Sequence, residues 1–532
     1  MKKYLITLLA ALLFYYFMLP PINLTSPLFY FYIFLVIGVF ILVSIPNYAT
    51  YNFKRIEVGK QTKILFFVCI SIIPIILLIN LVLSPIFNSK AYHNRITVEN
   101  SNFKEDISEV DFNHIPLLDK DSSSKLGDRV MGEMTDLVSQ FVVSDAYTQI
   151  NYNDKIVRVT PLEYSSLIKY LTNRKSGIPA YITVDSTTGE AKLVRLEKGM
   201  KYSNSAILFE NLNRYLRLKY PTLIFDRANF EIDNEGNPYF IVPIVKYTGI
   251  GIRKDITGAI ILNPVNGKTT KYKLEDIPSW VDHVYNADLI IEQVNDWGAY
   301  KNGFLNTIFG QKEVVATTTG YNYTILNDDV YMYTGITSVI ADESNIGFIL
   351  SNLRTKETKF YEISGAEEYS AMASAEGQVQ QMKYVSSFPL LINLNGNPTY
   401  LMSLKDNAGL VKMYAFVDVK DYQKVVVTDA NKGILTAANN YINEKGIDED
   451  LLKNSEVTVT DLKQVVIDGN TYYYFKNNKD IYRVSIKINS KVAFIKNNDI
   501  INVGFILCNW LLSCFLRNQA DTSESARHIR QE

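Results

Sequence analysis

Three long apolar runs begin the chain and differ from everything that follows. They are Tyr4–Leu19, Leu28–Ile45 and Ile64–Ile86, and none of them contains a charged residue. Each comes close to the roughly 20 residues that a helix needs to cross the hydrocarbon layer of a bilayer. The first run is the shortest and could act as a signal peptide, but no small-residue cleavage site follows it, so a retained helix is favoured. The pattern predicts three transmembrane helices within residues 1–90.

Basic residues are unevenly distributed around these runs. They precede the first run and fill the loop after the second, at Lys2, Lys3, Lys54, Arg55, Lys60 and Lys63. The loop between the first and second runs, PPINLTS, has no charge. Since loops rich in Lys and Arg remain in the cytoplasm, the N-terminus and the 46–63 loop are expected there. The sequence therefore predicts a multi-pass protein of the cytoplasmic membrane with a large extracytoplasmic region from about Asn88 onward.

Beyond the membrane part, helical and strand-like patterns alternate. The helical spacing at 367–383 places Met372, Ala375, Val379 and Met382 on one face. Runs such as GAIILN and MYAFVDV are β-branched and aromatic, as strands prefer. Five helices are expected, at Met131–Phe141, Asn204–Lys219, Val281–Ile308, Glu367–Lys383 and Asn431–Glu444.

The tripeptide Gly-Asn-Pro occurs twice in the same setting, at Gly236 and at Gly396. Each copy follows a predicted helix and joins two apolar runs, with Tyr239 or Tyr400 near the start of the second run. Gly supplies a positive φ and Pro fixes the entry to the next strand, which is hairpin chemistry. We therefore expect an α+β fold in which a helix laid on a small antiparallel sheet is made at least twice, with the tripeptide as scaffold. Weaker echoes lie at 184–194, 352–363 and 466–475.

The segment Asn204–Leu274 resembles the PepSY domain. The resemblance is carried by a helix, the hairpin FEIDNEGNPYFIVPIV and an apolar strand ending in ILNPVNGKTTKY. Asn263 stands where the family usually has Asp, and the weaker match at Glu367–Val427 lacks the terminal Gly. The resemblance implies an extracytoplasmic α+β binding module without a catalytic site, of the kind found in protease propeptides and membrane-anchored envelope proteins.

The domain boundaries follow from these patterns and from the polar stretch DKDSSSKLGD at 119–128. The expected organisation is three transmembrane helices at 1–90, a stalk at 91–128, an α+β segment at 129–200, a first PepSY-like module at 201–280, a helix with strands at 281–363, a second PepSY-like module at 364–428, a small β-rich segment at 429–500, and an apolar segment with a polar tail at 501–532. The apolar stretch INVGFILCNWLLSCFL in the last segment could be a short fourth span, a lipid-contacting helix or an aberrant terminus.

Composition narrows the class of protein. The net charge of −1 over 532 residues gives no electrostatic basis for binding nucleic acid. The cysteines are Cys69, Cys508 and Cys514, so residues 88–500 have no disulfide. A region of that size can build its core without one. This pattern fits a bacterial envelope protein.

The sequence lacks the residue patterns of common catalytic and metal sites. It has no zinc-ligand spacing, no nucleophile elbow and no phosphate loop. TGIGIR at 248–253 is interpreted as a turn and not as a nucleotide-binding loop. Asp342 and Glu343 are interpreted as part of a hairpin loop, because a calcium site would need more oxygen ligands at defined positions. No catalytic, cofactor-binding or metal residue is assigned, no cofactor is expected, and the ligand-binding residues are unknown.

One segment, 280–300, combines a histidine with carboxylates and could hold an acid–base site. Its notable side chains are Trp280, Asp282, His283, Glu292 and Trp297. The favoured interpretation is a helix in which Trp280 and Val284 pack inward and Glu292 and Asp296 are solvated.

The function expected from the sequence is that of a non-enzymatic, membrane-anchored binding or regulatory protein of the bacterial envelope. Its expected partners are the lipid bilayer and an envelope protein, peptide or wall polymer, and not nucleic acid. Two alternatives remain open: a subunit of a membrane complex assembled through the three helices, and an envelope hydrolase with an unrecognised carboxylate site.

Overall fold

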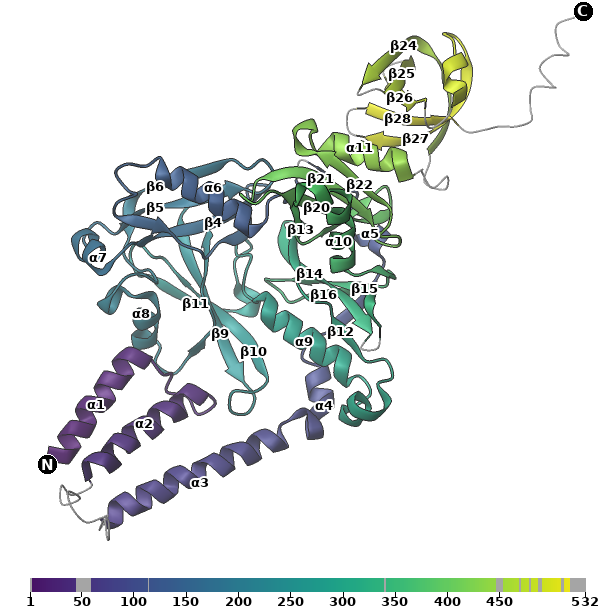
Figure 1. The fold of residues 1–532 in the computed structure, drawn as a ribbon. Coiled ribbons are helices and arrows are strands. Elements are labelled where there is room, and N and C mark those ends of the chain that lie inside the picture. The colour runs from purple at the N-terminus through teal and green to yellow at the C-terminus, as the bar shows by residue number, and fades with distance from the viewer. Residues whose placement is uncertain are drawn as a thin grey trace, which may run out of the picture.

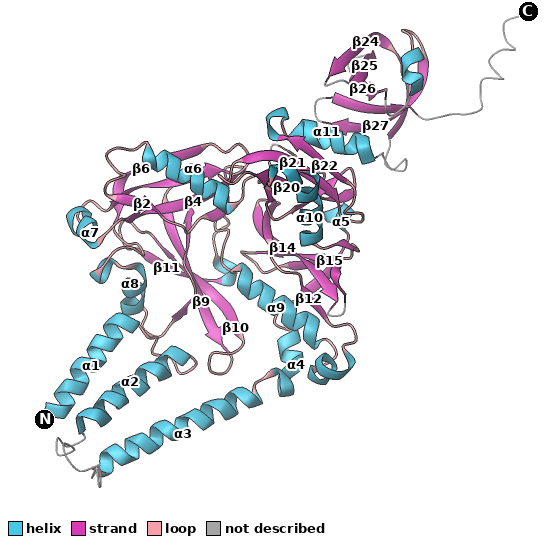
Figure 2. Ribbon diagram, in the orientation of Figure 1, coloured by secondary structure: helices cyan, strands magenta, loops and turns pink. Residues whose placement is uncertain are grey.

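The computed structural model describes residues 2–44, 59–112, 114–338, 341–445, 453–467, 470–477, 480–486, 490–508 and 511–516. Figure 1 shows three long N-terminal helices leaving one side of a large body, and a small C-terminal sheet at the opposite side. Figure 2 shows that strands make up most of the body. The chain has an α+β fold with several antiparallel sheets, as predicted.

The N-terminal helices are α1 (Lys2–Met18), α2 (Pro27–Ser44) and α3 (Lys60–Val82). By length and composition, α2 and α3 could each cross a membrane, whereas α1, with 17 residues, is shorter than a usual span. No side chain of α1 is buried, and only Phe40 in α2 and Thr62 in α3 are buried. Two apolar helices with uncovered sides are compatible with insertion into a membrane.

Four parts of the body contain the same series of elements, and we name them units 1 to 4. Each has a helix, two short strands and three further strands. Unit 1 contains α6 (Lys120–Gly132), β2 (Phe141–Val143), β3 (Thr148–Tyr152), β4 (Lys155–Tyr164), β5 (Ile178–Asp185) and β6 (Ala191–Met200), with an extra helix α7 (Leu167–Asn173). Unit 2 contains α8 (Leu212–Lys219), β7 (Ile224–Phe225), β8 (Asn229–Ile232), β9 (Pro238–Tyr247), β10 (Lys254–Leu262) and β11 (Thr269–Lys273). Unit 3 contains α9 (Ala287–Tyr300), β12 (Val315–Thr317), β13 (Asn322–Leu326), β14 (Asp329–Ser338), β15 (Ala341–Asn352) and β16 (Thr358–Tyr361). Unit 4 contains α10 (Glu368–Gln378), β18 (Val385–Ser386), β19 (Leu390–Leu394), β20 (Asn397–Lys405), β21 (Val411–Asp418) and β22 (Val425–Asp429).

The strand topology is identical in the four units. The two short strands pair one after the other along the same edge of the third strand, and the fourth and fifth strands follow on its other side. All of these pairings are antiparallel. Units 2 and 4 contain the two hairpins that the Gly-Asn-Pro repeat predicted. Units 1 and 3 were not recognised from the sequence.

The hairpin between the second and third strands uses different residues in different units. Its left-handed positions are Asn153 and Asp154 in unit 1, Gly236 in unit 2, Asn327 and Asp328 in unit 3, and Asn395 and Gly396 in unit 4. Asn, Asp and Gly all tolerate a positive φ, so several sequences can form this kind of turn. The unit is therefore repeated more often than the Gly-Asn-Pro motif.

The hairpin between the last two strands begins with Asp or Asn in every unit. Its side-chain Oδ1 accepts the backbone N–H groups of the residues two and three positions later, at 2.8 to 3.2 Å, for Asp185, Asn263, Asn352 and Asp418. This is the turn in which a short side chain replaces a backbone acceptor. The echoes at 184–194 and 352–363 are thus the same hairpin in units 1 and 3.

The units are layered, and neighbouring units share their cores. Units 1 and 2 share one hydrophobic core, units 2 and 3 a second, and units 3 and 4 a third. Alternate residues of β9 enter different cores, with Phe240 and Val242 facing unit 1 and Ile241 and Val245 facing unit 3. A strand buried on both faces has an unbroken apolar run, which explains the segment PYFIVPIV.

The segment 91–128 is not a stalk. Its strand β1 (Val98–Ser101) pairs in parallel with β16, and α5 (Phe103–Asp106) follows. Phe103, Ile107 and Ile115 are buried in the core of units 3 and 4. The segment is polar at most positions, but its apolar residues are placed where two layers meet.

The C-terminal part forms a separate six-stranded sheet in the order β23-β27-β28-β26-β25-β24. Helix α11 (Ile434–Lys445) precedes this sheet in the chain and packs on β21 and β22 of unit 4. The strands are β23 (Lys453–Thr458), β24 (Thr460–Ile467), β25 (Asn470–Asn477), β26 (Asp480–Ser485), β27 (Ile500–Cys508) and β28 (Leu511–Leu516). The described parts of the apolar run at 501–516 are therefore two antiparallel strands, and the interpretations as a fourth span or a lipid-contacting helix were wrong. Residues 517–532 lie outside the described part of the chain.

Several predicted helices have different bounds in the structure. The helix expected at Met131–Phe141 was wrong, because α6 ends at Gly132, turns follow it, and Phe141 begins β2. The helix expected at Val281–Ile308 is only α9, because residues 281–286 are not helical. The other three predictions correspond to α8, α10 and α11 with shorter or shifted ends.

Unit 2 is attached directly to the ends of the three N-terminal helices. The Asn80 side chain of α3 both donates to and accepts from the backbone of Ile250, at 2.9 Å each. Gly251 N–H donates to the Thr25 carbonyl before α2, at 2.9 Å. A Cβ on Gly251 would lie 2.3 Å from Cγ of Pro27, so glycine is needed for this close approach. TGIGIR is thus the turn that the sequence predicted, and it rests on the helix ends.

Candidate ligand-binding cavity

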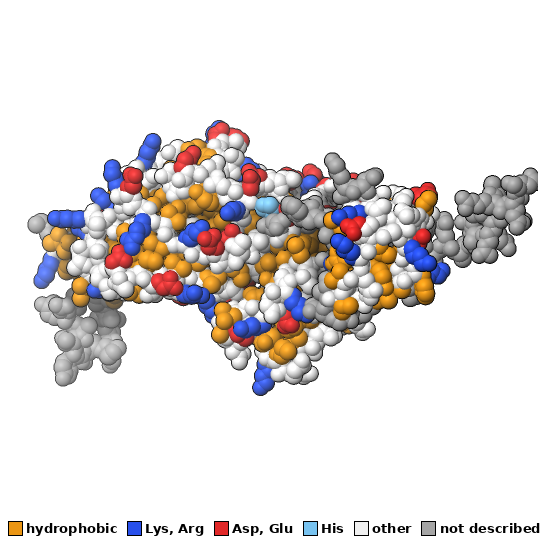
Figure 3. Space-filling model, turned by 90° about the horizontal axis from the view of Figure 1, so that it is seen from above, with side chains coloured by type: hydrophobic (Ala, Val, Ile, Leu, Met, Phe, Trp, Pro, Cys, Tyr) orange, Lys and Arg blue, Asp and Glu red, His pale blue; other side chains and the backbone are white. Residues whose placement is uncertain are grey.

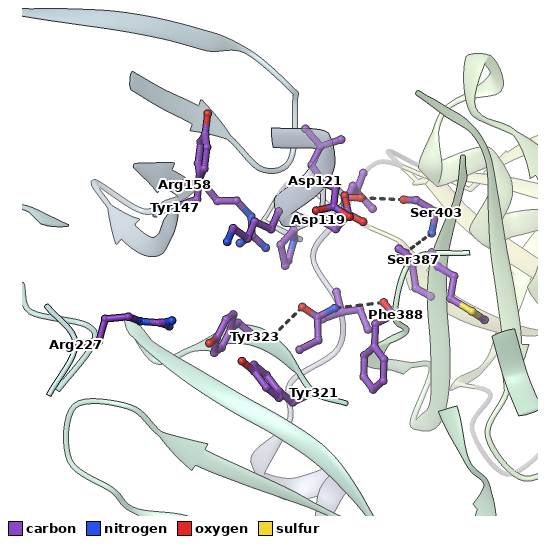
Figure 4. A pocket seen from close by; sticks show the side chains of 18 residues that line it. Asp119, Asp121, Tyr147, Arg158, Arg227, Tyr321, Tyr323, Ser387, Phe388 and Ser403 are labelled. Carbon is purple, nitrogen blue, oxygen red and sulfur yellow. Dashed lines mark hydrogen bonds between the residues drawn. The ribbon is translucent and has the colours of Figure 1, made fainter. Parts of the chain in front are cut away.

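A cavity of about 380 Å³ lies where the four units meet. Residues from every unit line it, together with the segment that leads into α6 (Figure 4). The side chains with chemistry to offer are Asp119, Lys120, Asp121, Tyr147, Arg158, Arg227, Tyr321, Asn322, Tyr323, Ser387, Phe388 and Ser403. The cavity is therefore a product of the assembly of the units and not of any single one.

Arg158 is the most unusual residue of the cavity wall. It lies in the middle of β4 and is only 5% exposed, and no hydrogen bond or ion pair to it is found among the described residues. Burial lowers the pKa of its guanidinium to about 10, and the nearby Asp119 and Asp121 partly oppose that effect. Gln149, its cross-strand neighbour on β3, is 1% exposed, and neither of its side-chain polar atoms has a partner in the described structure. Buried polar groups are normally paired, so this region has unused binding capacity.

The charges around the cavity favour an anion. Asp119 forms an ion pair with Lys405 and also caps α6 through the Ser122 N–H, at 2.9 Å. Its charge is therefore already balanced. The remaining charged groups are one anion, Asp121, and the three cations Lys120, Arg158 and Arg227. Figure 4 shows Arg158 and Arg227 on one side of the cavity and Asp119 and Asp121 on another.

Aromatic rings form much of the remaining wall. The rings of Tyr321 and Tyr323 meet at 5.6 Å and 64°, and Tyr323 also contacts the His283 ring at 5.6 Å. The Tyr147 hydroxyl is buried without a partner in the described structure, and burial raises its pKa. Phe388 completes the apolar surface. Such rings can hold a flat or apolar group beside the cations.

Hydrogen bonds hold the wall of unit 4 in place. Ser403 donates through its hydroxyl to the Leu117 carbonyl at 2.8 Å, and its N–H donates to the Ser387 hydroxyl at 3.0 Å. Asn322 donates to the Phe388 carbonyl at 3.3 Å. These bonds link units 3 and 4 with the segment before α6. The cavity thus has walls that are organised before any ligand enters.

The acid–base candidates from the sequence do not come together. Asp282 and His283 precede α9 and are buried, at 2% and 6% exposure. Glu292 is more than half exposed and forms an ion pair with Arg95 at 2.7 Å. Asp296 pairs with the same arginine, but its side chain is only 16% exposed, so the interpretation of Asp296 as solvated was wrong. Trp280 packs on Tyr239 at 5.1 Å between ring centroids, as the packing interpretation required.

Asp282 and His283 instead join a third buried group, Glu231. The two Glu231 carboxyl oxygens accept the N–H groups of Asp282 and His283, at 2.9 Å each. Asp282 accepts the Asn151 N–H at 2.8 Å, and the His283 Nε2 lies 2.6 Å from the Gln149 carbonyl. The cluster ties units 1, 2 and 3 together behind the cavity.

Burial dominates the ionisation of this cluster. Burial raises the pKa of Glu231 to about 8. It also raises the pKa of Asp282, and the nearby Glu231 charge adds to that rise. Burial lowers the pKa of His283 to about 4. His283 is buried and is not among the residues that line the cavity, so a ligand in the cavity does not reach its imidazole for proton exchange. We interpret the cluster as a structural link and not as an acid–base site.

The pair Asp342 and Glu343 and the histidines His93 and His114 do not line the cavity. Asp342 and Glu343 lie within strand β15 and not in a hairpin loop, which corrects that interpretation. His93 bonds the Trp297 carbonyl at 2.7 Å, and His114 pairs with Asp111 at 2.8 Å. Within the described residues, no group of three His, Cys, Asp or Glu side chains could hold a metal ion.

Sequence reasoning missed Arg158 and Gln149. A signal was present, because Arg158 interrupts the apolar run Ile156, Val157, Val159 of a strand whose centre is buried. A single charge inside such a run indicates a buried polar site. No pattern in the sequence predicted that Arg227, Tyr323 and Ser403 lie in the same cavity.

Comparison with known proteins gives no family for this chain. No family model matches, and no curated protein matches. Among solved structures, an ACO/RPE65 chimera in a monoclinic crystal form aligns with 8% identity over 70% of this chain and 65% of its own, at a TM-score of 0.13. The N-terminal domain of Nup159 aligns with 10% identity over 72% of this chain and 95% of its own, at a TM-score of 0.12. At such TM-scores neither likeness bears on fold or function.

Proposed function

We propose that the protein is a non-enzymatic, membrane-anchored binding protein of a bacterial envelope. In this proposal the extracytoplasmic units bind a protein, a peptide or a wall polymer. The observation that carries it is the pre-organised cavity at the junction of the four units, with an unpaired buried cation in its wall. The acid–base candidates of the sequence, by contrast, are tied into packing contacts.

The attachment of unit 2 to the helix ends supports the proposed topology. The end of α1, the start of α2 and the end of α3 all contact unit 2, through bonds such as Arg217 Nε to the Leu19 carbonyl at 3.0 Å. The end of α2 at Ser44 and the start of α3 at Lys60 are therefore the helix ends that lie away from unit 2. This geometry agrees with a cytoplasmic basic loop and an external body.

Exposed apolar side chains beside α1 support the same arrangement. Helix α7 is an insertion found in unit 1, and its Leu167, Ile168 and Leu171 are each more than half exposed. The Tyr170 hydroxyl, on the same helix, lies 2.7 Å from the Ile207 carbonyl. Further along the chain from Ile207, the Arg214 guanidinium lies over the Tyr16 ring of α1. Apolar side chains at the outer end of a span are well placed to enter the lipid headgroup region.

The surface charge gives no reason to add a nucleic acid partner. Figure 3 shows positive and negative side chains interspersed on the face that it presents, with apolar side chains between them. The PepSY resemblance of units 2 and 4 belongs to the same proposal, since it implies a binding module. The alternative of a complex assembled through the helices remains compatible with the uncovered sides of α2 and α3.

Labelling with a membrane-impermeant maleimide in intact cells tests the topology. In a chain without Cys69, Cys508 and Cys514, a cysteine at the exposed Asn204 should react from outside, and one at Lys60 should react only after the cells are opened. Reaction of Lys60→Cys in intact cells, or protection of Asn204→Cys, would overturn the membrane arrangement.

Site-specific crosslinking in the full-length chain tests the binding role. A photoreactive amino acid at Lys120, which is exposed and lines the cavity, should capture a partner in intact membranes. The same amino acid at the exposed Lys198 on β6 is the control and should capture far less. Equal capture at the two positions would mean that the cavity is not the binding site.

A further inference from the structure

The cavity wall contains a cation that the fold does not use. Removing a guanidinium from water is costly unless an anion or several acceptors replace its hydration. Arg158 has neither among the described residues, although Asp119 and Asp121 lie near enough to influence its pKa. Asp119 is engaged by Lys405, so it is not a free counter-ion for Arg158. An anion from outside the chain would complete the environment of Arg158.

A second cation stands at the same cavity. Arg227 lines it from unit 2, is exposed, and has no hydrogen bond or ion pair among the described residues. Planar guanidinium groups bind carboxylates through paired hydrogen bonds, which gives both strength and orientation. Two arginines from different units therefore offer a binding point for an acidic group, with Arg158 inside and Arg227 nearer the solvent.

The other residues of the cavity wall indicate what kind of chemical group carries the carboxylate of the ligand. Tyr321, Tyr323 and Phe388 contribute ring surfaces to the same cavity, and Figure 4 shows Tyr323 on the side of Arg227 and Phe388 on the side away from it. A volume of about 380 Å³ lies at the lower end of the range of small-molecule sites, so a folded domain cannot enter. The occupant must be small, or the end of a longer chain.

We propose that this cavity binds a small organic carboxylate that carries a planar apolar group, with Arg158 pairing to the carboxylate and Tyr321, Tyr323 and Phe388 enclosing the apolar part. The proposal rests on the binding role proposed above and specifies the chemistry of the ligand. A free metabolite and the C-terminal residue of a peptide share this chemistry. Either would supply the anion that the wall of the cavity lacks.

Calorimetric titration of the full-length protein in detergent micelles tests the proposal. The probes are N-acetylphenylalanine and its C-terminal amide, which differ only in the negative charge. The wild type should bind the acid at least about 10-fold more tightly than the amide, because a hydrogen bond to a charged group contributes about 10- to 100-fold in affinity. Equal binding of the two probes, binding of neither, or tighter binding of inorganic phosphate than of the acid would overturn the carboxylate assignment.

Substitution of Arg158 tests whether this residue causes the tighter binding of the acid than of the amide. Arg158→Met removes the charge and keeps most of the volume, and it should weaken binding of the acid by about 10- to 100-fold while leaving the weak binding of the amide unchanged. Arg195→Met, on exposed β6 of the same unit, is the control and should bind like the wild type. Unchanged affinity of Arg158→Met for the acid would overturn the proposal.

Thermal unfolding separates a ligand-binding role from a structural one. Without ligand, Arg158→Met should melt at the same temperature as the wild type or higher, since an unpaired buried charge is removed. A lower melting temperature would show that Arg158 stabilises the fold, and the proposal would fail. Tyr323→Leu is a second variant, and it should lose affinity for the acid while Arg158 is intact.

A decapeptide that ends in phenylalanine with a free carboxylate distinguishes the two sources of the ligand. It should bind as tightly as the acid if the site reads peptide ends, and more weakly if the site encloses a free metabolite. If none of these probes binds while the photoreactive amino acid at Lys120 still captures a partner specifically in membranes, the carboxylate class is rejected and the binding role stands.

Discussion

At the residue scale, small differences in side-chain volume decide how the cavity wall is built. Gly127 in α6 is an example, because a Cβ there would lie 2.1 Å from the Tyr147 hydroxyl. The glycine allows this ring to lie against the helix and to form part of the cavity wall. The other glycine of the same helix, Gly132, has nothing within 4 Å of the position of a Cβ.

Gly127→Ala should therefore destabilise the protein by about 1 to 3 kcal/mol through overpacking. Gly132→Ala is the matched control and should be neutral or slightly stabilising, because Gly132 is the last residue of α6 and has open space around it. Adding Tyr147→Phe to Gly127→Ala should restore much of the loss, since the atom in closest contact is then missing. Chemical denaturation of these variants measures the values, and equal effects at the two glycines would contradict the explanation.

At the scale of the element, one turn geometry is repeated with different residues. Gly396 has φ of 72° in the hairpin between β19 and β20, where a side chain is strained. Gly377 lies in helix α10 with open space around it. The same substitution should thus have opposite effects at the two positions.

Gly396→Ala should lower the free energy of unfolding by about 1 kcal/mol or more, because alanine disfavours the left-handed region. Gly377→Ala should raise it by about 0.5 to 1 kcal/mol, because alanine is the better helix former. The measurement is equilibrium unfolding in urea, followed by far-ultraviolet circular dichroism. A stabilising effect at Gly396 would mean that the turn does not have this geometry.

At the scale of the whole molecule, the buried cluster of Glu231, Asp282 and His283 links three units and makes their assembly sensitive to pH. Glu231 has a pKa raised by burial to about 8, against 4.5 when exposed. Between these values the folded protein holds a proton that the unfolded chain has released. The contribution of Glu231 to stability therefore falls as pH rises through this window. The contribution of His283, whose pKa is lowered to about 4, has the opposite sign below its ordinary value of 6.5.

The free energy of unfolding should fall by up to about 1.4 kcal/mol per pH unit between about pH 4.5 and 8 as a result of Glu231. Glu231→Gln should make that dependence shallower, whatever its effect on stability at a fixed pH. Glu235→Gln, at an exposed position of the adjacent turn, is the control and should keep the wild-type slope. Denaturation curves at several pH values measure the slopes, and identical slopes for Glu231→Gln and the wild type would contradict the explanation.

The sequence by itself determined the local features. The unbroken apolar runs of α2 and α3, the turn at TGIGIR and the hairpins at Gly236 and Gly396 were all readable, because length, periodicity and positive φ are properties of short segments. Units 1 and 3 were missed because α7 interrupts one of them and because their hairpins turn on Asn-Asp pairs.

Tertiary structure alone decided where those segments are buried and what they enclose. The polar segment 91–128 became part of a core because Phe103 and Ile107 fall between two layers. The described parts of the apolar run at 501–516 became two antiparallel strands because β23 and β26 provide edges to pair with. The cavity exists only where four units meet, since Arg158, Arg227, Tyr323 and Ser403 are far apart in the chain, and no local pattern encodes contacts between distant segments.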